Sequence, residues 1–208
     1  PIEKLAVRTG VTNIDINNRG DAGTQEITTW TTDDTGTPAS LEITNFQVIA
    51  NREHDSDHNV KNQVVLSYTE ENGVLLDVQE IRSIGFHSSG TAIKQIIATY
   101  TDVDKDELLD IKVIENFNID SQGNVGMTVI TKYASGTISN GGVGEINPAN
   151  GTEIDRQTIE NLQLDIRGNA LRQEILKEYY DSVTGTFKFS ENQIIENDEY
   201  TFHDRTGR

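Results

Sequence analysis

Four carboxylates lie close together in one short stretch and could bind a hard cation. Asp102, Asp104 and Asp106 alternate along the chain, and Asp110 follows four positions later. Calcium is bound by oxygens that converge from alternating positions of a loop. The stretch departs from that pattern, because Val113 stands at the twelfth position, where a bidentate Glu normally closes the loop. We therefore favour an acidic hairpin turn and keep calcium as the one candidate cofactor.

A second polar stretch holds His54 and His58 with Asp55 and Asp57 between them. Two imidazoles four residues apart can chelate zinc from one face of a helix, but between two strands this spacing defines no common face. We interpret the stretch as an exposed polar turn. The chain has no Cys, and it contains no nucleophile elbow, phosphate-binding Gly loop or zinc-protease motif. The sequence therefore predicts a non-enzymatic protein without catalytic residues.

The charge balance narrows the classes of partner. Asp and Glu number 34 against 17 Lys and Arg, which gives a formal net charge of -17. Nucleic acids and anionic membranes attract clustered cations, so we expect neither as a partner. No apolar run approaches the roughly 20 residues that a membrane helix needs, so we expect no membrane insertion. The chain begins at Pro1 without an initiator Met, and we expect it to be part of a longer protein.

The elements that position these residues are best defined in residues 114–133. A strand is expected from Ile114 to Asp120, then a tight turn, and then a returning strand that ends at Tyr133. Apolar residues recur with the period of two that a pleated strand imposes. The Asp-x-x-Gly-Asn turn between them supplies residues that tolerate positive φ or bond their own backbone. The stretch predicts a β-hairpin.

The same hairpin recurs along the chain. We call its first strand the leading strand and its second the return strand. The leading strands are centred on Asn13, Asn45, Ser83, Asn116 and Asn161. The return strands begin with Ala or Val and end eight or nine positions later with an aromatic residue: Ala22 to Trp30, Val60 to Tyr68, Ala92 to Tyr100, Val125 to Tyr133 and Ala170 to Tyr179. Fixed offsets in five copies indicate an internal repeat.

These copies predict one repeat array over residues 1–208. The expected repeats are 13–44, 45–82, 83–115, 116–160 and 161–198, with a partial sixth copy at 199–208. An insertion rich in Gly and Asn occupies residues 134–153. Long insertions of this kind usually lie at a sheet edge, where they are mobile or form a contact point.

One stretch has a local preference that conflicts with the repeat. Residues 170–180, ALRQEILKEYY, have high intrinsic helix propensity. Their register matches the other four return strands, and tertiary context often overrides a weak local preference. We predict a strand.

The return strands also predict which face of the sheet is dry, that is, buried away from solvent, and which is wet, that is, exposed to it. Val60, Val64, Leu66 and Tyr68 alternate on one face, and a Gln with a β-branched residue occupies the other. The pattern predicts an all-β fold of tandem antiparallel hairpins, whose long sheet twists or curls into a spiral, tube or shell and so buries its aromatic side.

The aromatic residue followed by an acidic turn, as in EYYDSVTGTF, and the Asp-x-x-Gly-Asn turn together resemble YD-repeat (Rhs-type) proteins and other giant bacterial surface proteins built of β-hairpin repeats. The resemblance implies hairpins that wind into a β-sheet shell or spiral in a large surface or secreted protein. Tyr100 and Tyr133 depart from the motif, since Thr101 and Ala134 follow them in place of Asp. The resemblance assigns no functional residue to this chain.

Two functions remain as expectations. The first is a structural repeat region of an extracellular or cell-surface bacterial protein, which serves as scaffold, filament, stalk or shell wall. Its partners would be neighbouring repeats of the same chain, or other copies that join through sheet edges. The second is an adhesin-like module that recognises a carbohydrate or a protein through its turns or its insertion, with calcium in the acidic turns.

Overall fold

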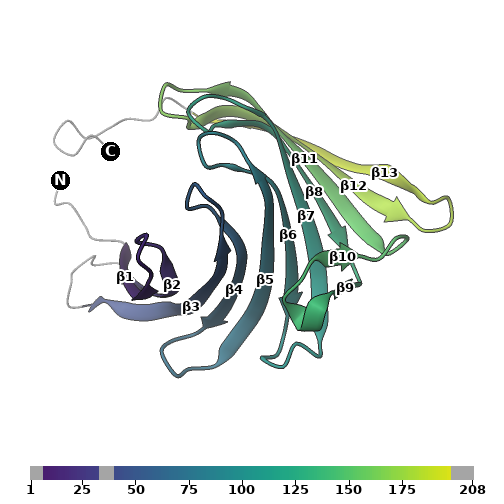
Figure 1. Cartoon of the computed structure of the whole chain (residues 1–208). Helices are drawn as coiled ribbons and strands as arrows, with labels where there is room; N and C mark the ends of the chain where they lie inside the picture. The colour runs from purple at the N-terminus through teal and green to yellow at the C-terminus, as the bar shows by residue number, and fades with distance from the viewer. Residues whose placement is uncertain (1–6, 33–39, 198–208) are drawn as a thin grey trace. The chain divides into compact units, whose positions relative to one another are not determined.

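The computed structural model describes residues 7–32 and 40–197. The proposed sixth copy at 199–208 lies outside the described residues. Within them the chain is built of antiparallel β-strands, which confirms the all-β fold class (Figure 1). No helix in the described ranges is both long and apolar enough to cross a membrane.

Eleven strands form one sheet in the order β1-β2-β3-β4-β5-β6-β7-β8-β11-β12-β13. Their bounds are Val7–Ile16 (β1), Ala22–Thr31 (β2), Glu42–His54 (β3), Val60–Tyr68 (β4), Leu75–Phe86 (β5), Ala92–Tyr100 (β6), Leu108–Ile119 (β7), Val125–Tyr133 (β8), Glu153–Leu164 (β11), Ala170–Asp181 (β12) and Thr186–Glu196 (β13). Sequence neighbours are therefore sheet neighbours, apart from the step from β8 to β11, which skips the insertion. Short connections make this arrangement the natural one for consecutive hairpins.

The contacts divide the chain into two compact units. Unit 1 comprises Pro1–Ile84, Ile96–Ile111 and Ser135–Pro148, and unit 2 comprises Gly85–Gln95, Lys112–Ala134 and Ala149–Arg208.

The insertion has its own small structure in unit 1. Strands β9 (Gly136–Ile138) and β10 (Ile146–Pro148) pair antiparallel, with a short 3-10 turn, η2 (Asn140–Gly142), between them. Ile146 is buried. Long insertions usually lie at a sheet edge, whereas this one contacts side chains of β4, β5 and β7.

The hairpin at residues 114–133 forms as predicted, with β7 and β8 on either side of the Asp120 turn. The helix-prone stretch from Ala170 is strand β12, which confirms that register overrode propensity. It pairs with β11 on one side and β13 on the other, so its backbone groups are satisfied by the sheet.

Most of the buried residues of unit 1 lie on β3 to β7. On β6 the predicted dry face is confirmed, because Ile96, Ala98 and Tyr100 are buried. On β4 the prediction is wrong: Val60, Val64, Leu66 and Tyr68 are only half-buried. Val65 and Ser67, which belong to the expected wet face, are buried. Both faces of this part of the sheet are therefore largely covered.

Candidate functional site

The turns between leading and return strands repeat one hydrogen-bond pattern. In the Asp120 turn, the Asp120 N–H donates to Asn124 O at 2.9 Å and the Gly123 N–H donates to Asp120 O at 3.0 Å. Gly123 has φ 90°, the left-handed conformation that closes a three-residue hairpin loop. The same backbone bonds occur in the turns that begin at Asn17, His87 and Asp165.

The turn carboxylates hold the backbone in place. Asp120 Oδ1 accepts from the N–H groups of Gln122 and Asn124 at 2.8 and 3.0 Å, and Oδ2 accepts from Asn124 Nδ2 at 2.8 Å. The pKa of Asp120 is lowered because the Asn124 amide and these N–H groups stabilise the charged form. Asp55 and Asp165 make the equivalent bonds to Asn59 and Asn169 and have lowered pKa values for the same reason.

These lowered pKa values predict a stability that falls with acidification. The unfolded chain, with Asp near its ordinary pKa of 3.8, binds more protons than the folded chain at acid pH. The stabilisation is therefore complete above about pH 4 and is lost as pH falls through the lower folded pKa values. Asn17 fills the same turn position without a charge, so Asp120→Asn with Asp165→Asn should keep the turns.

The measurement is the melting temperature of this double variant from about pH 5 to about pH 2, followed by circular dichroism. We expect the variant to lose less stability than the natural chain over this range. The matched control exchanges two exposed turn residues, Asp57→Asn with Asp104→Asn, and should follow the natural chain. An unchanged slope in the first variant would contradict the role given to the turn carboxylates.

The calcium candidates lie in the turn between β6 and β7 and at the start of β7. Asp102 accepts hydrogen bonds from the N–H groups of Asp106 and Glu107 at 3.1 and 2.8 Å, which lowers its pKa. Asp104 and Asp106 are exposed, whereas Asp110 is buried on β7. Across residues 7–32 and 40–197, no three His, Asp or Glu side chains are grouped so that they could hold a metal ion. The structure thus does not bring the four carboxylates together.

The histidine stretch ends β3 and forms the next turn. His58 has φ 68° at the position that Gly takes in the other turns. Its Nδ1 lies 2.5 Å from Oδ1 of Asp21, in the neighbouring turn. Arg19, from that same turn, donates to the carbonyls of Asp55 and Ser56 at 3.1 and 2.9 Å. The stretch is a polar turn, as predicted, and it also links two turns.

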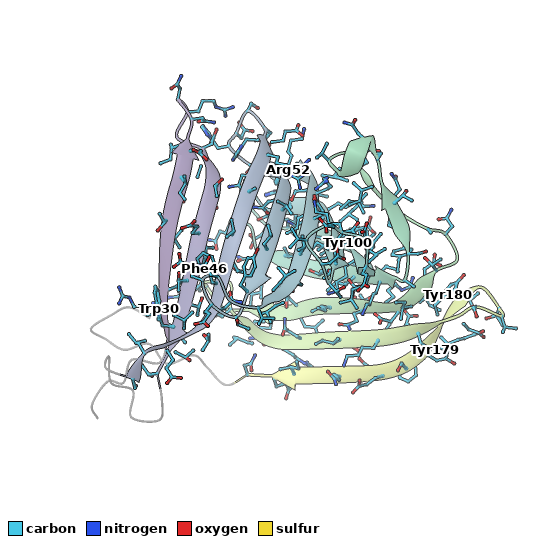
Figure 2. All side chains as sticks on the ribbon, turned by 90° about the horizontal axis from the view of Figure 1, so that it is seen from below. Trp30, Phe46, Arg52, Tyr100, Tyr179 and Tyr180 are labelled. Atoms are coloured by element: carbon cyan, nitrogen blue, oxygen red, sulfur yellow. The ribbon has the colours of Figure 1, made fainter. Side chains whose placement is uncertain are left out.

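A buried charge cluster in unit 1 was not found from the sequence. Glu80 of β5 is 0% exposed and pairs with three cations, Arg52 of β3, Arg82 of β5 and Lys105 of the β6–β7 turn. We call these four residues the Glu80 cluster. Arg82 Nη1 lies 2.9 Å from Glu80 Oε2, the oxygen that also pairs with Arg52, while Lys105 pairs with Oε1. Figure 2 labels Arg52 and, near the cluster, Tyr100 at the end of β6.

The cluster lies on the face that the sequence predicted to be dry. Glu80 is opposite Val64 in the β4–β5 register, and Val78, Glu80 and Arg82 alternate along β5. Burial raises the pKa of Tyr100, and the Glu80 carboxylate adds to the rise. A buried charge is costly unless it is paired. The signal for this cluster in the sequence was the presence of charged residues at alternate positions of β5. It was not sufficient, because other members of the cluster come from another strand and a turn.

The cluster is connected to the insertion through Arg82. Arg82 Nε donates to Gly144 O at 2.7 Å and Nη2 donates to Gly142 O at 3.3 Å. Asn62 of β4 donates to Val143 O at 2.8 Å. Three consecutive carbonyl groups of the insertion are thus satisfied by side chains of the sheet. We infer that the cluster orients Arg82 and so fixes the insertion in place.

A second recurring feature joins a hairpin to the one before it at four places in the described residues. The side-chain amide of an Asn at the end of a leading strand donates to the carbonyl of the first residue of the previous return strand. We call this contact the Asn clamp. Its four examples are Asn51 to Ala22, Asn116 to Ala92, Asn161 to Val125 and Asn197 to Ala170, at 3.0, 2.9, 2.7 and 2.8 Å.

The clamping Asn is itself held by its own return strand. Gln25, Gln63 and Gln173 donate to Oδ1 of Asn13, Asn51 and Asn161, and Thr128 donates to Oδ1 of Asn116. This gives a role to the Gln that recurs at a fixed place in the return strands. It also identifies Asn51 as the residue equivalent to Asn13, in place of Asn45, which lies near the start of β3 and pairs with Thr29.

Asn161→Ala is expected to lower the free energy of unfolding by about 1–3 kcal/mol, because it removes two hydrogen bonds and leaves their partners unsatisfied. Urea-induced unfolding of the full chain gives the value. Asn18→Ala, at the exposed centre of a turn, is the control and should change stability by less than about 0.5 kcal/mol. Equal effects of the two substitutions would show that the clamp adds nothing to stability.

Comparison with known proteins adds little to this geometry. No family model and no curated protein matches the chain. A protein of unknown function from Bacteroides fragilis NCTC 9343 is similar in structure, with a TM-score of 0.37 and 10% sequence identity over 71% of this chain and 91% of that chain. A similarity at this TM-score supports no conclusion about fold or function.

Proposed function

We propose that this chain is a structural, non-enzymatic run of hairpin repeats in a larger extracellular or cell-surface bacterial protein, where it serves as scaffold, filament, stalk or shell wall. The observation that supports this proposal is the Asn clamp, which joins successive hairpins by the same two-sided contact. A contact that recurs between one unit and the unit before it can be repeated without new chemistry, which is how repeat arrays gain length. The resemblance to YD-repeat proteins points the same way.

The proposal includes a sheet that curls into a spiral, tube or shell. Its support is the bulge position next to the clamp: the register shifts at Arg52, after Asn51, and again at Leu162, after Asn161. A bulge bends its strand and increases the local twist. Bends at these equivalent places in the β3–β4 and β11–β12 hairpins would turn the sheet in the same direction. Electron micrographs of the purified protein test this, and straight, flat particles would count against it.

The array is tested by removing one hairpin. A chain that starts at residue 40 lacks β1 and β2, and Asn51 loses its acceptor Ala22 O. In an array the remaining hairpins should keep their strand signal in circular dichroism. The slope of the free energy of unfolding against urea concentration should fall roughly in proportion to the surface that is lost with the hairpin. A chain that starts at residue 7 is the control. Loss of all strand structure in the shorter chain would contradict an array and favour one indivisible globule.

A second candidate function is an adhesin-like module that binds a carbohydrate or a protein. The observation that favours it is the fixed insertion, whose backbone is held by Arg82 and Asn62 while Val143 stays 45% exposed. A rigidly held loop can present a binding surface at low entropic cost. A glycan array with and without calcium tests this function. Hits that disappear in Arg82→Met would support it, and an array without hits would argue against carbohydrate recognition.

A further inference from the structure

The outer edge of β1 has half of an Asn clamp. Gln25 Nε2 donates to Asn13 Oδ1 at 2.8 Å, just as Gln63 and Gln173 hold Asn51 and Asn161. In those two copies the Asn Nδ2 then donates to a carbonyl of the preceding return strand. Within the described part of the chain, Asn13 Nδ2 makes no such bond. The Asn13 amide is thus oriented in the same way, at a strand that ends the sheet.

The same edge offers backbone groups and apolar side chains. β1 pairs with β2 on one side and is the last strand of the sheet on the other (Figure 1). A terminal strand presents a row of unpaired N–H and C=O groups that another strand can join. Val7, Val11 and Ile16 are 54%, 56% and 59% exposed. An added strand would cover part of this apolar surface.

We propose that the outer edge of β1 binds a return strand of this same hairpin type, with Asn13 Nδ2 donating to the carbonyl of its first residue. The inference rests on the proposed repeat array and identifies the partner at one of its ends. Continuity with the four existing clamps selects this occupant, since in each of them the strand beside the clamping Asn is a return strand that begins with Ala or Val. A second copy offers β13 at its free edge, but β13 precedes Asn197 and is itself a leading strand.

The test uses the full chain and a labelled peptide with the sequence of Ala22–Thr31, whose first carbonyl already accepts from Asn51. Fluorescence anisotropy measures its affinity, and hydrogen exchange followed by mass spectrometry locates the binding site. We expect saturable binding and slower exchange in β1. Asn13→Asp keeps an oxygen that can accept from Gln25 but removes the amide donor, and it should weaken binding about three- to tenfold.

Asn18→Asp adds the same charge nearby and should leave the affinity unchanged. A scrambled peptide controls for sequence. The proposal is overturned by absence of saturable binding, by protection at β13 alone, or by equal effects of Asn13→Asp and Asn18→Asp. Self-association in sedimentation that Asn13→Asp abolishes would instead identify a second copy as the occupant and overturn it as well. The hairpin-removal experiment does not involve the peptide, so the array and this edge can fail independently.

Discussion

Glu80→Gln is expected to lower the free energy of unfolding by about 3–5 kcal/mol, the usual effect of removing one partner from a buried ion pair. Glu80 is fully buried and is the carboxylate to which Arg52, Arg82 and Lys105 all pair. The side chains of Arg52 and Lys105 are 26% and 29% exposed and can turn towards water. The side chain of Arg82 is 8% exposed, so most of the cost arises there.

Urea-induced unfolding followed by circular dichroism measures this effect. The matched control is Glu53→Gln, because Glu53 also pairs with a cation, Lys61, but both side chains are exposed. Exposed pairs contribute about 0–1 kcal/mol, so the control should lie in that range. Glu80→Gln should also speed hydrogen exchange in residues 136–148, since Arg82 binds the carbonyls of Gly142 and Gly144. A loss no larger than that of Glu53→Gln would show that the cluster is not a structural anchor.

Ile111→Ala is expected to cost about 2–5 kcal/mol, the range for truncating a buried aliphatic side chain where the cavity cannot collapse. Ile111 of β7 is 1% exposed. The backbone of the insertion lies directly against it: a Cβ added to Gly136 would be 2.4 Å from Ile111 Cδ1 and 2.5 Å from Asn147 O. Gly136 is therefore required for the close approach, and Ile111 fills the space beneath it.

Leu109→Ala is the matched control, because Leu109 lies two residues earlier on the same face of β7 but is 59% exposed. We expect it to cost less than about 1 kcal/mol, since most of its surface is already in water. Hydrogen exchange of β9 and β10 gives a second measurement, which should speed up in Ile111→Ala and stay unchanged in Leu109→Ala. Similar stabilities of the two variants would contradict the packing of the insertion on β7.

The hairpins were predictable because their chemistry is local. Asp120 bonds groups two and four residues away, and Gly123 supplies the positive φ, so residues 120–124 contain all that the turn needs. The Asp55 turn has His58 where the others have Gly, and it keeps the pattern because its carboxylate still bonds Asp57 and Asn59. Alternation of apolar residues then placed the flanking strands.

The alignment of the repeats by sequence was wrong where two Asn residues lie on the same strand. β3 is 13 residues long and holds both Asn45 and Asn51. An Asn-Phe pair at residues 45 and 46 resembles that at 116 and 117, but the hydrogen bonds of Asn51 with Ala22 and Gln63 mark the equivalent position. Those partners lie on other strands, so the equivalence follows from pairing and could not be read from composition.

The Asp102 stretch shows the same limit at the candidate site. Its alternating acids suggested calcium, yet Lys105, which stands among them, pairs with Glu80, 25 residues earlier. Arg52 reaches the same carboxylate from 28 residues before it. Which cations meet a given carboxylate depends on which strands become neighbours.

The sequence by itself determined the hairpins, their turns and the location of the insertion, because these depend on alternation and on hydrogen bonds that span a few residues. Only the tertiary structure decided that Asn51 closes a clamp and that the insertion lies on Arg82 and Ile111. Each of these depends on groups brought together across the sheet, where burial makes an unpaired charge or amide costly. That cost selects one arrangement among several that the local sequence allows.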